Sequence, residues 1–423
     1  MALIEAAECK ITVLNNHGLG VGSTEQGVVE LPYVLPGDIA EFERHSYRGK
    51  SNCILKNITE INSNRNTPLC KYFGACGGCL LQHLTDEDYT AFKYKLLESA
   101  LAEYDITASI APMVTIKGGS RRRANLEAIK KNGQLYLGFH RFHSHQIINI
   151  DECVALLPEL SNLLHPLKIT LSEVMEDKQK LQMFITKASN GIDLSLEIQN
   201  CQFLEENKRI KLRSFAEEYN LTRLIFRYRK KVDVIYGTET PYILFDNIPV
   251  EIDAYCFLQA SFESDNILSG LVRKYIESPN SDQKLVDLFC GRGTYTLPLS
   301  NVFDIDGYES DQKAIAALSA AVLENKRSIN VYKRDLFADP LSFDELNKYS
   351  ACVINPPRAG AEAQINEIAK GNIKKLCYIS CNPITFSRDS KTLINAGYKL
   401  VELTPVDQFY WSPHLEIVGY FER

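Results

Sequence analysis

A cysteine directly after an apolar run is the first residue of this sequence that could do covalent chemistry. Residues 376–380 are apolar and β-prone, which predicts a buried strand, and the following Asn382-Pro383 predicts a turn. Cys381 is therefore expected at the carboxyl end of a strand, where open α/β sheets have their ligand crevices. A thiol there can act as a nucleophile, and it can equally be an ordinary buried cysteine, so the rest of the chain has to decide.

A second set of cysteines has the spacing of a metal-binding segment. Cys70, Cys76 and Cys79 lie close together, and glycines between them let the backbone wrap tightly around a bound centre. In a cytosolic chain, where thiols stay reduced, such clustering indicates a metal rather than disulfides. A zinc ion and an iron–sulfur cluster both require a fourth cysteine, for which Cys153 is the best candidate, and the spacing does not choose between them.

Glycines, acids and an amide mark a third candidate site in the last third of the chain. Gly291 and Gly293 follow a predicted strand and let the backbone approach a ligand, and Glu309, Asp335 and Asn355 each follow a strand of their own. The third glycine of a dinucleotide fingerprint is missing. The pattern instead resembles the S-adenosylmethionine site of class I methyltransferases, in which the first acid meets the ribose and the second the adenine.

Two basic segments are candidates for contact with RNA, although the net charge of the chain is −6. Residues 117–145 hold seven Lys and Arg against one acid, and residues 223–231 hold five and none. In the first of these segments the basic residues are interleaved with aromatics, and guanidinium and aromatic groups bind phosphates and unpaired bases. The proposed contacts are Arg121, Arg122, Arg123, His140 and Arg141.

The elements that must position these residues fit a chain of two or three domains. The length of 423 residues and the composition, 45% hydrophobic and 24% charged, are ordinary for a soluble globular protein. No apolar run reaches about 18 residues and the first residues do not look like a signal peptide, so we expect no membrane contact and a cytoplasmic location. We expect a monomer.

The hydrophobic pattern divides the chain into three expected domains of a multidomain α/β protein. Residues 1–62 carry short strands and turns that predict a small β-barrel, and residues 31–38 resemble the TRAM module of RNA-modifying enzymes. Residues 63–255 form an α+β central domain that begins with a helix at 86–104, although part of 86–124 is free to pack on the catalytic domain. Residues 256–423 alternate strands with helices, which predicts a parallel, doubly wound, Rossmann-like sheet.

Taken together, these segments resemble the RNA (uracil-5-)-methyltransferase family, in particular its 23S rRNA branch with a TRAM domain and an iron–sulfur cluster. The matching segments run from residue 31 to residue 416 and cover nearly the whole chain. The most specific are the cysteine segment 70–79, Phe257-Leu258-Gln259, residues 287–291, 355–360 and 380–383, Asp407-Gln408-Phe409 and Pro413-His414-Leu415-Glu416.

The resemblance implies a cofactor set, a reaction and the residues that perform it. It implies methyl transfer from S-adenosylmethionine to C5 of a uridine in RNA through a covalent adduct between Cys381 and C6 of the uracil, with Glu416 as the base. It implies a [4Fe-4S] cluster on Cys70, Cys76, Cys79 and Cys153. It implies cofactor contacts at Gln259, Phe289, Gly291, Thr294, Glu309, Asp335 and Asn355. Arg358 is a further candidate cation for the nucleophile and for RNA.

The sequence departs from the family pattern at three positions, which leaves alternatives open. Asn355 replaces the usual Asp, Thr294 stands where Asn is common, and Ser261 stands where Asn often occurs. All three keep hydrogen-bonding capacity. The alternatives are an RNA-binding iron–sulfur protein with reduced or altered activity, a tRNA (uracil-5-)-methyltransferase, and a methyltransferase for another base or for protein, which would not need the cysteine nucleophile.

Overall fold

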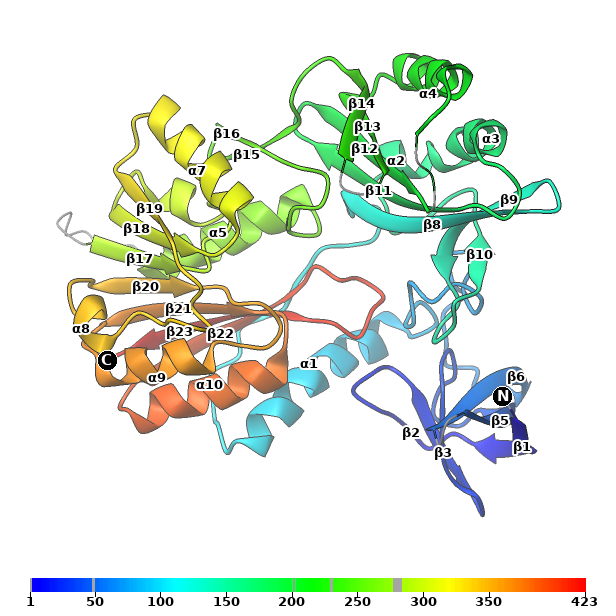
Figure 1. Cartoon of the computed structure of the whole chain (residues 1–423). Helices are drawn as coiled ribbons and strands as arrows, with labels where there is room; N and C mark the ends of the chain where they lie inside the picture. The colour runs from blue at the N-terminus through cyan, green and yellow to red at the C-terminus, as the bar shows by residue number, and fades with distance from the viewer. Residues whose placement is uncertain (1, 48–49, 200, 202, 229–230, 277–283) are drawn as a thin grey trace.

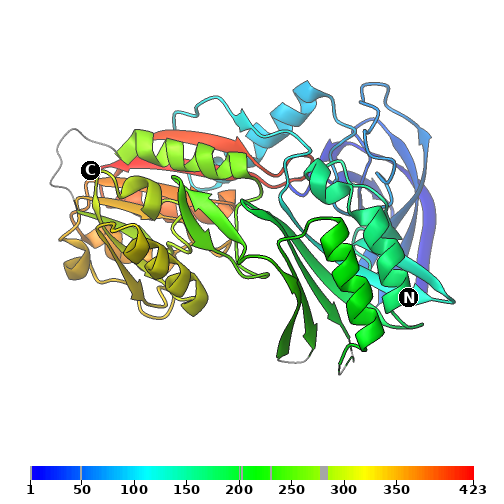
Figure 2. The same ribbon diagram turned by 90° about the horizontal axis from the view of Figure 1, so that it is seen from above.

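The computed structural model describes residues 2–47, 50–199, 201, 203–228, 231–276 and 284–423. In Figure 1 a C-terminal sheet lies on the left, a central sheet on the upper right and the N-terminal strands on the lower right. Seen from above, the C-terminal and central sheets stand side by side, with the small hairpin of β15 and β16 between them (Figure 2). Within these described ranges, no helix is long and apolar enough to cross a membrane.

The C-terminal region is built on a sheet whose described strands run in the order β19-β18-β17-β20-β21-β23-β22-β7. The first five strands are parallel, as the alternation of strands and helices predicts. Buried clusters fill both faces of the sheet, because the strands are apolar on both sides. The elements are α5 (Phe262–Ile276), β17 (Lys284–Leu288), α6 (Thr296–Leu299), β18 (Asp304–Glu309), α7 (Gln312–Glu324), β19 (Ile329–Lys333), α8 (Phe343–Leu346), β20 (Ala351–Ile354), α9 (Glu362–Lys370), β21 (Lys375–Ser380), α10 (Pro383–Asn395), β22 (Lys399–Asp407) and β23 (Glu416–Glu422).

The last two strands break the parallel pattern. The chain runs through β22 at the edge and returns through β23, which inserts between β22 and β21 and is antiparallel to both. The parallel sheet expected from the sequence is confirmed for the five strands from β17 to β21, whereas the hairpin that connects β22 to β23 reverses the direction of the chain at this edge. The reversal brings the start of β23 to the same sheet edge as the end of β21 (Figure 1).

A segment from the middle of the chain completes this sheet. β7 (Val114–Thr115) pairs in parallel with β22, and α1 (Asp86–Glu103) packs beside α10. The helix starts where Thr85 caps it by accepting a hydrogen bond from the main-chain nitrogen of Asp88, which confirms the helix expected over residues 86–104. The segment after β7, which carries Arg121, Arg122 and Arg123, therefore starts at the edge of the C-terminal sheet.

The central region is a second sheet, whose described strands run in the order β10-β9-β8-β11-β12-β13-β14. Helices α3 and α4 cover it, and their leucines fill a separate buried cluster. The basic segment 223–231 begins with the strand β13, which ends at Tyr228, and residues 229 and 230 lie outside the described residues. The elements are β8 (Arg123–Lys131), β9 (Gln134–His140), β10 (Ile147–Asn149), α2 (Pro158–Ser161), α3 (Leu164–Val174), β11 (Lys180–Ala188), β12 (Gly191–Ile198), α4 (Glu206–Glu218), β13 (Arg223–Tyr228), β14 (Lys231–Gly237), β15 (Tyr242–Phe245) and β16 (Ile248–Glu251).

The N-terminal region is all β in its described part. Its strands form two small sheets, β1-β5-β6 and β2-β3-β4, which enclose a buried cluster around Val29, Leu31 and Phe42. The strands are β1 (Ala2–Lys10), β2 (Val13–Leu14), β3 (Gly20–Thr24), β4 (Gly27–Leu31), β5 (Ile39–Tyr47) and β6 (Lys50–Glu60). The short strands expected from the sequence are confirmed, whereas the identity of this region as a TRAM module stays a prediction.

Candidate active site

Sheet register brings Cys381 and Glu416 together. β21 and β23 pair antiparallel, with Ser380 opposite Ile417 as the last recorded pair. One residue further along the same register places Cys381 opposite Glu416, the first residue of β23. β21 ends here because Asn382 caps α10, accepting a hydrogen bond from the nitrogen of Ile384 (3.2 Å), with proline at the first helical position. The two residues that the sequence paired only by resemblance are thus neighbours in space.

The surroundings of Cys381 favour the protonated thiol in the free protein. The side chain is half-buried, and this burial raises the pKa of the Cys381 thiol to about 11. The charge of Glu416 raises the pKa further, and the positive charge of Arg358 lowers it. The start of α10 also directs the positive end of a helix dipole at this point, which favours a thiolate. Proton loss from the thiol is therefore helped by Arg358 and opposed by Glu416.

Glu416 has the properties of a base that works near neutral pH. Its side chain is almost fully buried, and burial raises the pKa of the Glu416 carboxyl to about 7. A hydrogen bond from Gln408 acts in the opposite direction and lowers that pKa. A carboxylate with a pKa close to the working pH is well matched to proton removal.

Gln408 and Tyr295 are two buried polar residues of this site to which the sequence assigned no role. The Gln408 amide nitrogen donates to Glu416 Oε2 (2.8 Å) and to Gln259 Oε1 (2.9 Å). The Tyr295 hydroxyl accepts from the side-chain nitrogens of Gln259 (3.5 Å) and Asn355 (3.3 Å). The motif Asp407-Gln408-Phe409 was the one available signal for Gln408, and the sequence gave no sign that its amide faces the predicted base.

The strand order reverses between β17 and β20, and because open α/β sheets have their ligand crevice at such a point, the candidate cofactor crevice is assigned to the ends of these strands. Phe289, directly after β17, has φ +61°, a left-handed conformation that turns the chain sharply. Gly293 has φ +93°, and a Cβ there would come within 2.6 Å of Leu318, so only glycine fits. The Thr296 hydroxyl donates to the buried Asp287 carboxylate (2.6 Å), which ties this turn to β17.

The acids of the crevice stand at the ends of neighbouring strands, as the sequence predicted. Glu309, at the end of β18, accepts from the main-chain nitrogens of Gly291 (3.0 Å), Ser310 (2.7 Å) and Asp311 (2.9 Å) and is therefore held rigidly. Asp335 is exposed after β19 and accepts from the nitrogen of Phe337 (3.0 Å). These carboxylates, with the amides of Gln259 and Asn355, are a donor and acceptor set that fits a ribose, an adenine and an amino acid group.

The remaining predicted cofactor residues lie around the same turn. Thr294 is half-buried beside Gly293, and the ring of Phe289 lies 5.3 Å from that of Phe337. Asn355, directly after β20, is half-buried. All seven predicted cofactor residues thus lie along the ends of β17, β18, β19 and β20 or in the segment before α5.

The loop that leads to Glu416 is anchored by elements from far away in the chain. Buried Lys93, on α1, pairs with Asp407 (2.7 Å), whose other oxygen accepts from the Tyr89 hydroxyl (2.6 Å). The carbonyl of Trp411 accepts from the nitrogens of Leu80 (2.9 Å) and Leu81 (3.1 Å). The cysteine segment 70–79 is therefore joined directly to the loop between β22 and β23.

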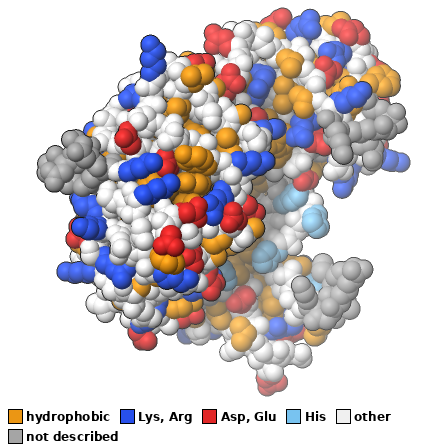
Figure 3. All heavy atoms as spheres, turned by 60° about the vertical axis from the view of Figure 1, so that its left-hand side comes forward, with side chains coloured by type: hydrophobic (Ala, Val, Ile, Leu, Met, Phe, Trp, Pro, Cys, Tyr) orange, Lys and Arg blue, Asp and Glu red, His pale blue; other side chains and the backbone are white. Residues whose placement is uncertain are grey.

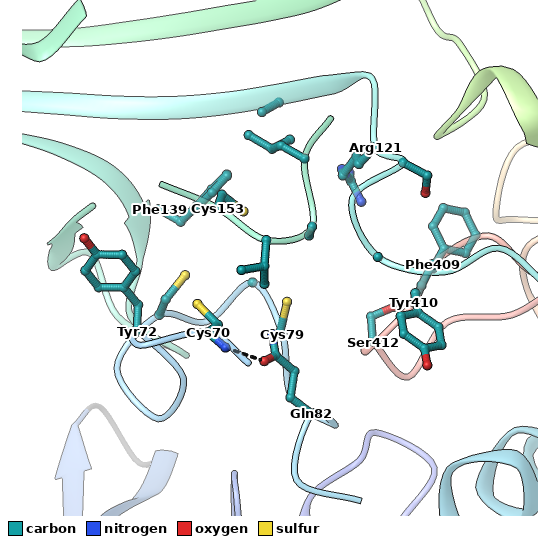
Figure 4. Close-up of a pocket in the computed structure, with 18 of the residues that line it drawn as sticks. Cys70, Tyr72, Cys79, Gln82, Arg121, Phe139, Cys153, Phe409, Tyr410 and Ser412 are labelled. Carbon is teal, nitrogen blue, oxygen red and sulfur yellow. Dashed lines mark hydrogen bonds between the residues drawn. The ribbon is translucent and has the colours of Figure 1, made fainter. Parts of the chain in front are cut away.

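The four predicted metal ligands line one cavity of about 340 Å³. The sulfur atoms of Cys70, Cys79 and Cys153 face the same space in Figure 4, and the fourth ligand, Cys76, also lines it. All four are free thiols. Burial raises the pKa of Cys79 to about 12 and also raises those of Cys76 and Cys153. Four soft sulfur ligands that line one cavity fit a cluster of iron and sulfide.

The same cavity is also lined by the loop between β22 and β23, which leads to Glu416. Phe409, Tyr410 and Ser412 form one wall, and Arg121 stands beside the thiols (Figure 4). Among the described residues, no group of three or more His, Cys, Asp or Glu side chains is arranged so that it could hold a metal ion. The four cysteines line one cavity, and the metal that they would hold stays a prediction.

The three consecutive arginines do not form a common RNA-binding surface. Arg122 is fully buried and pairs with Asp265 of α5 (2.7 Å), so the prediction that it contacts RNA is wrong. Arg123 is half-buried and donates to the carbonyls of Cys256 (2.9 Å) and Leu258 (3.4 Å). Arg121 has an exposed side chain at the cysteine cavity. Arg122 and Arg123 therefore join the central region to the C-terminal region.

The other predicted RNA contacts stay accessible. His140 and Arg141 begin the turn from β9 to β10, which together with Gly77 lines a surface hollow of about 390 Å³. The main chain of Gly77 donates to the carbonyl of His140 (2.9 Å), so this turn is fixed to the cysteine segment. Histidine side chains gather where the surface is hollowed in Figure 3. Arg358 is exposed after β20, and its carbonyl accepts from Asn382 (3.1 Å), next to Cys381.

Comparisons with known proteins show which family this chain resembles. A family model described as tRNA (uracil-5-)-methyltransferase matches residues 91–423. An uncharacterized RNA methyltransferase of Agrobacterium fabrum is 33% identical over 98% of this chain and 98% of its own length. The 23S rRNA (uracil(1939)-C(5))-methyltransferase of Shewanella amazonensis is 29% identical over 98% of this chain and 95% of its own length.

A solved structure has a similar fold over almost the full length. It is that of Pyrococcus abyssi tRNA (uracil-54, C5)-methyltransferase in complex with S-adenosyl-L-homocysteine. The TM-score is 0.75 at 21% identity, and the match covers 98% of this chain and 99% of that one. At this identity the similarity concerns the fold.

Proposed function

The chain belongs to the tRNA (uracil-5-)-methyltransferase family and is an S-adenosylmethionine-dependent RNA (uracil-5-)-methyltransferase, and from that premise we propose that it methylates a uridine of 23S rRNA through a covalent adduct on Cys381. The observation that carries the proposal is the pairing of β21 with β23, which sets Cys381 opposite Glu416 beside the crevice at the ends of β17 and β20. A thiol and a buried carboxylate facing each other suit a reaction that needs a nucleophile and a base.

The proposed reaction begins with addition of the Cys381 thiolate to C6 of the uracil. C5 of uracil is a poor nucleophile, and addition at C6 turns the ring into an enolate with electron density on C5. S-adenosylmethionine, bound by the crevice residues, supplies an electrophilic methyl group. C5 then forms a bond to that methyl group while the bond between methyl and sulfur breaks and S-adenosylhomocysteine leaves with the electron pair. The target base has to be unpaired or flipped out of its helix to reach Cys381.

The second half of the proposed reaction belongs to Glu416. After methylation, C5 carries both a hydrogen and the new methyl group. Glu416 removes the C5 proton, the electron pair restores the C5–C6 double bond, and the Cys381 thiolate leaves. The raised pKa of the Glu416 carboxyl, about 7, lets the group accept a proton near neutral pH and pass it to water afterwards.

The choice of 23S rRNA over tRNA rests on two features of this chain. The relative from Shewanella, which is named for 23S rRNA, aligns from end to end with it. The N-terminal strands and the cysteine segment also fit the TRAM module and cluster of the rRNA branch. The family description and the Pyrococcus structure name tRNA instead, so tRNA is the second candidate.

An assay with separated RNAs tests this choice. Purified protein is incubated with methyl-labelled S-adenosylmethionine and either 23S rRNA or tRNA from cells that lack the gene, and labelled nucleosides are identified by mass spectrometry. We expect labelled 5-methyluridine in 23S rRNA. Label confined to tRNA would replace this substrate with the second candidate, and label in another nucleoside would overturn the proposed target atom.

We also propose that Cys70, Cys76, Cys79 and Cys153 hold a [4Fe-4S] cluster. The support is the one cavity that all four cysteines line. The cluster, when bound, supplies a rigid centre that fastens the segment leading to Leu80 and Leu81. Because these residues hold Trp411, the cluster would stabilise the loop before Glu416.

Iron content tests the cluster. Protein purified without oxygen should contain about four iron and four sulfide per chain. Cys153→Ser is expected to lose most of the iron, since it removes one of four ligands. The matched control is Cys201→Ser, which changes a free cysteine outside the cavity and should keep the iron. Bound zinc in place of iron, or full iron in Cys153→Ser, would contradict the assignment.

An RNA-binding protein with reduced methyltransferase activity is the alternative suggested by Asn355. The Asn355 side-chain nitrogen donates to the Tyr295 hydroxyl (3.3 Å), so the amide is hydrogen-bonded to another residue of the candidate site. We expect the natural protein to transfer methyl groups, and Asn355→Asp to change the rate by less than about tenfold, with tighter cofactor binding because a carboxylate attracts the sulfonium. Steady-state kinetics with RNA measure both. An inactive natural protein that Asn355→Asp activates would favour the alternative.

A further inference from the structure

Gln408 lies at the centre of a buried chain of hydrogen bonds that crosses the active site. It is the first residue after β22 and is 5% exposed. This series of hydrogen bonds runs from Glu416 through Gln408 and Gln259 to the Tyr295 hydroxyl and ends at Asn355. It therefore links the start of β23 to the crevice at the end of β20.

The main chain fixes which way the Gln408 amide points. Its Oε1 accepts a hydrogen bond from the nitrogen of Ala260 (3.2 Å), which can only donate. The amide nitrogen must then face the other way, toward Glu416 Oε2 and Gln259 Oε1. Glu416 consequently receives an N–H donor and never the amide oxygen. A donor of this kind stabilises a carboxylate over its protonated form.

The other groups around Glu416 do not supply such stabilisation. Cys381 faces it from the end of β21, and the Tyr295 hydroxyl lies on the turn after β17. Neither group is cationic, and burial raises the pKa of both. Within the described ranges, the hydrogen bond from Gln408 is the one recorded for the Glu416 carboxylate.

We propose that Gln408 is a positioning residue that holds Glu416 ionised and aimed at the C5 proton, taking its own orientation from Ala260 and Gln259. The proposal deepens the proposed function and rests on Glu416 being the base. Gln408 does not touch the substrate. Its effect falls on the second half of the reaction, after the Cys381 adduct and the new methyl bond have formed.

Release of the adduct as a function of pH tests the proposal. Gln408→Met keeps the volume and removes the donor, so the acid limb of adduct release should move up by about one pH unit and release at pH 7 should slow by about fivefold. Formation of the adduct should continue, because it does not need an ionised Glu416. Higher pH should restore release.

Gln364→Met is the matched control. Gln364 is a buried glutamine of α9 whose amide bonds the main chain of Leu341 (2.9 and 3.0 Å) and takes no part in the hydrogen bonds that join Glu416, Gln408 and Gln259. Its substitution removes comparable hydrogen bonds and should leave the pH profile of release unchanged. Thermal unfolding of both variants shows whether the losses in stability match.

Gln408→Glu covers the case in which Gln408→Met does not fold. Glutamate keeps the shape and the acceptor for Ala260, but places a second carboxyl against Glu416, so the acid limb should again move upward. An unchanged acid limb in the folded variants, or a uniform loss at every pH, would overturn the positioning role. Absence of methyl transfer in the natural protein would instead contradict the proposed function, so the two failures are distinguishable.

Discussion

Cys381→Ala is expected to abolish methyl transfer to RNA, lowering the rate on the order of 10⁴-fold or more. The reason is chemical, since without addition at C6 the C5 carbon stays too weak a nucleophile to take the methyl group. Cys381 is half-buried at the end of β21 and outside the buried clusters, so the fold should survive its loss. Labelled methyl transfer and the covalent protein–RNA complex on a denaturing gel measure the effect.

Cys377→Ala is the matched control for this prediction. Cys377 lies on the same strand and its thiol is fully buried, where burial raises its pKa. Its loss should cost some stability by leaving a small cavity, and methyl transfer should continue. Measurable turnover in Cys381→Ala, or a covalent complex that survives this substitution, would contradict the assignment of the nucleophile.

Glu416→Gln is expected to stop the reaction halfway. The amide has the size of the carboxyl and cannot remove the C5 proton, so turnover should fall by about 10²- to 10⁴-fold while the methylated RNA stays attached to Cys381. The trapped complex should be visible on a denaturing gel and should carry the methyl label. Absence of any trapped complex would argue against Glu416 as the base.

The pH dependence of turnover follows from the same residue. The pKa of the Glu416 carboxyl is raised to about 7, so the group is protonated below that pH and cannot act as a base there. Turnover in the natural protein should fall as the pH drops below about 7. Glu416→Gln should lack this acid limb, because its amide does not titrate.

The parallel part of the catalytic sheet and the crevice at its edge were predictable from the sequence. Strands followed by glycines and acids have a local pattern, and the carboxyl ends of parallel strands share one edge. The position of β23 was not predictable in this way. Both β21 and β23 are apolar on both faces, and nothing in such strands states which neighbour they choose. The resemblance predicted that Cys381 and Glu416 act together, and the register of β21 and β23 then showed that they face each other.

The basic segment shows where a charge pattern fails. Arg121, Arg122 and Arg123 are consecutive residues of the same type, yet the first is exposed, the second is buried and the third is half-buried. Arg122 is buried because Asp265, far along the chain, supplies its countercharge, and Arg123 is used by main-chain carbonyls. A count of charges contains no information about such distant partners. Cys153 is the opposite case, since three clustered cysteines require a fourth ligand and the downstream cysteine chosen for that role does line the cavity.

The most direct test of the central claim uses RNA in which the target uridine is replaced by 5-fluorouridine. Fluorine at C5 cannot be removed by a base, so the adduct formed after methyl transfer should persist. Protein, S-adenosylmethionine and this RNA are combined, digested with protease and nuclease, and analysed by mass spectrometry. We expect a methylated fluorouridine attached to the peptide that contains Cys381. Attachment to another residue, or no adduct while the unmodified RNA is methylated, would contradict the covalent mechanism.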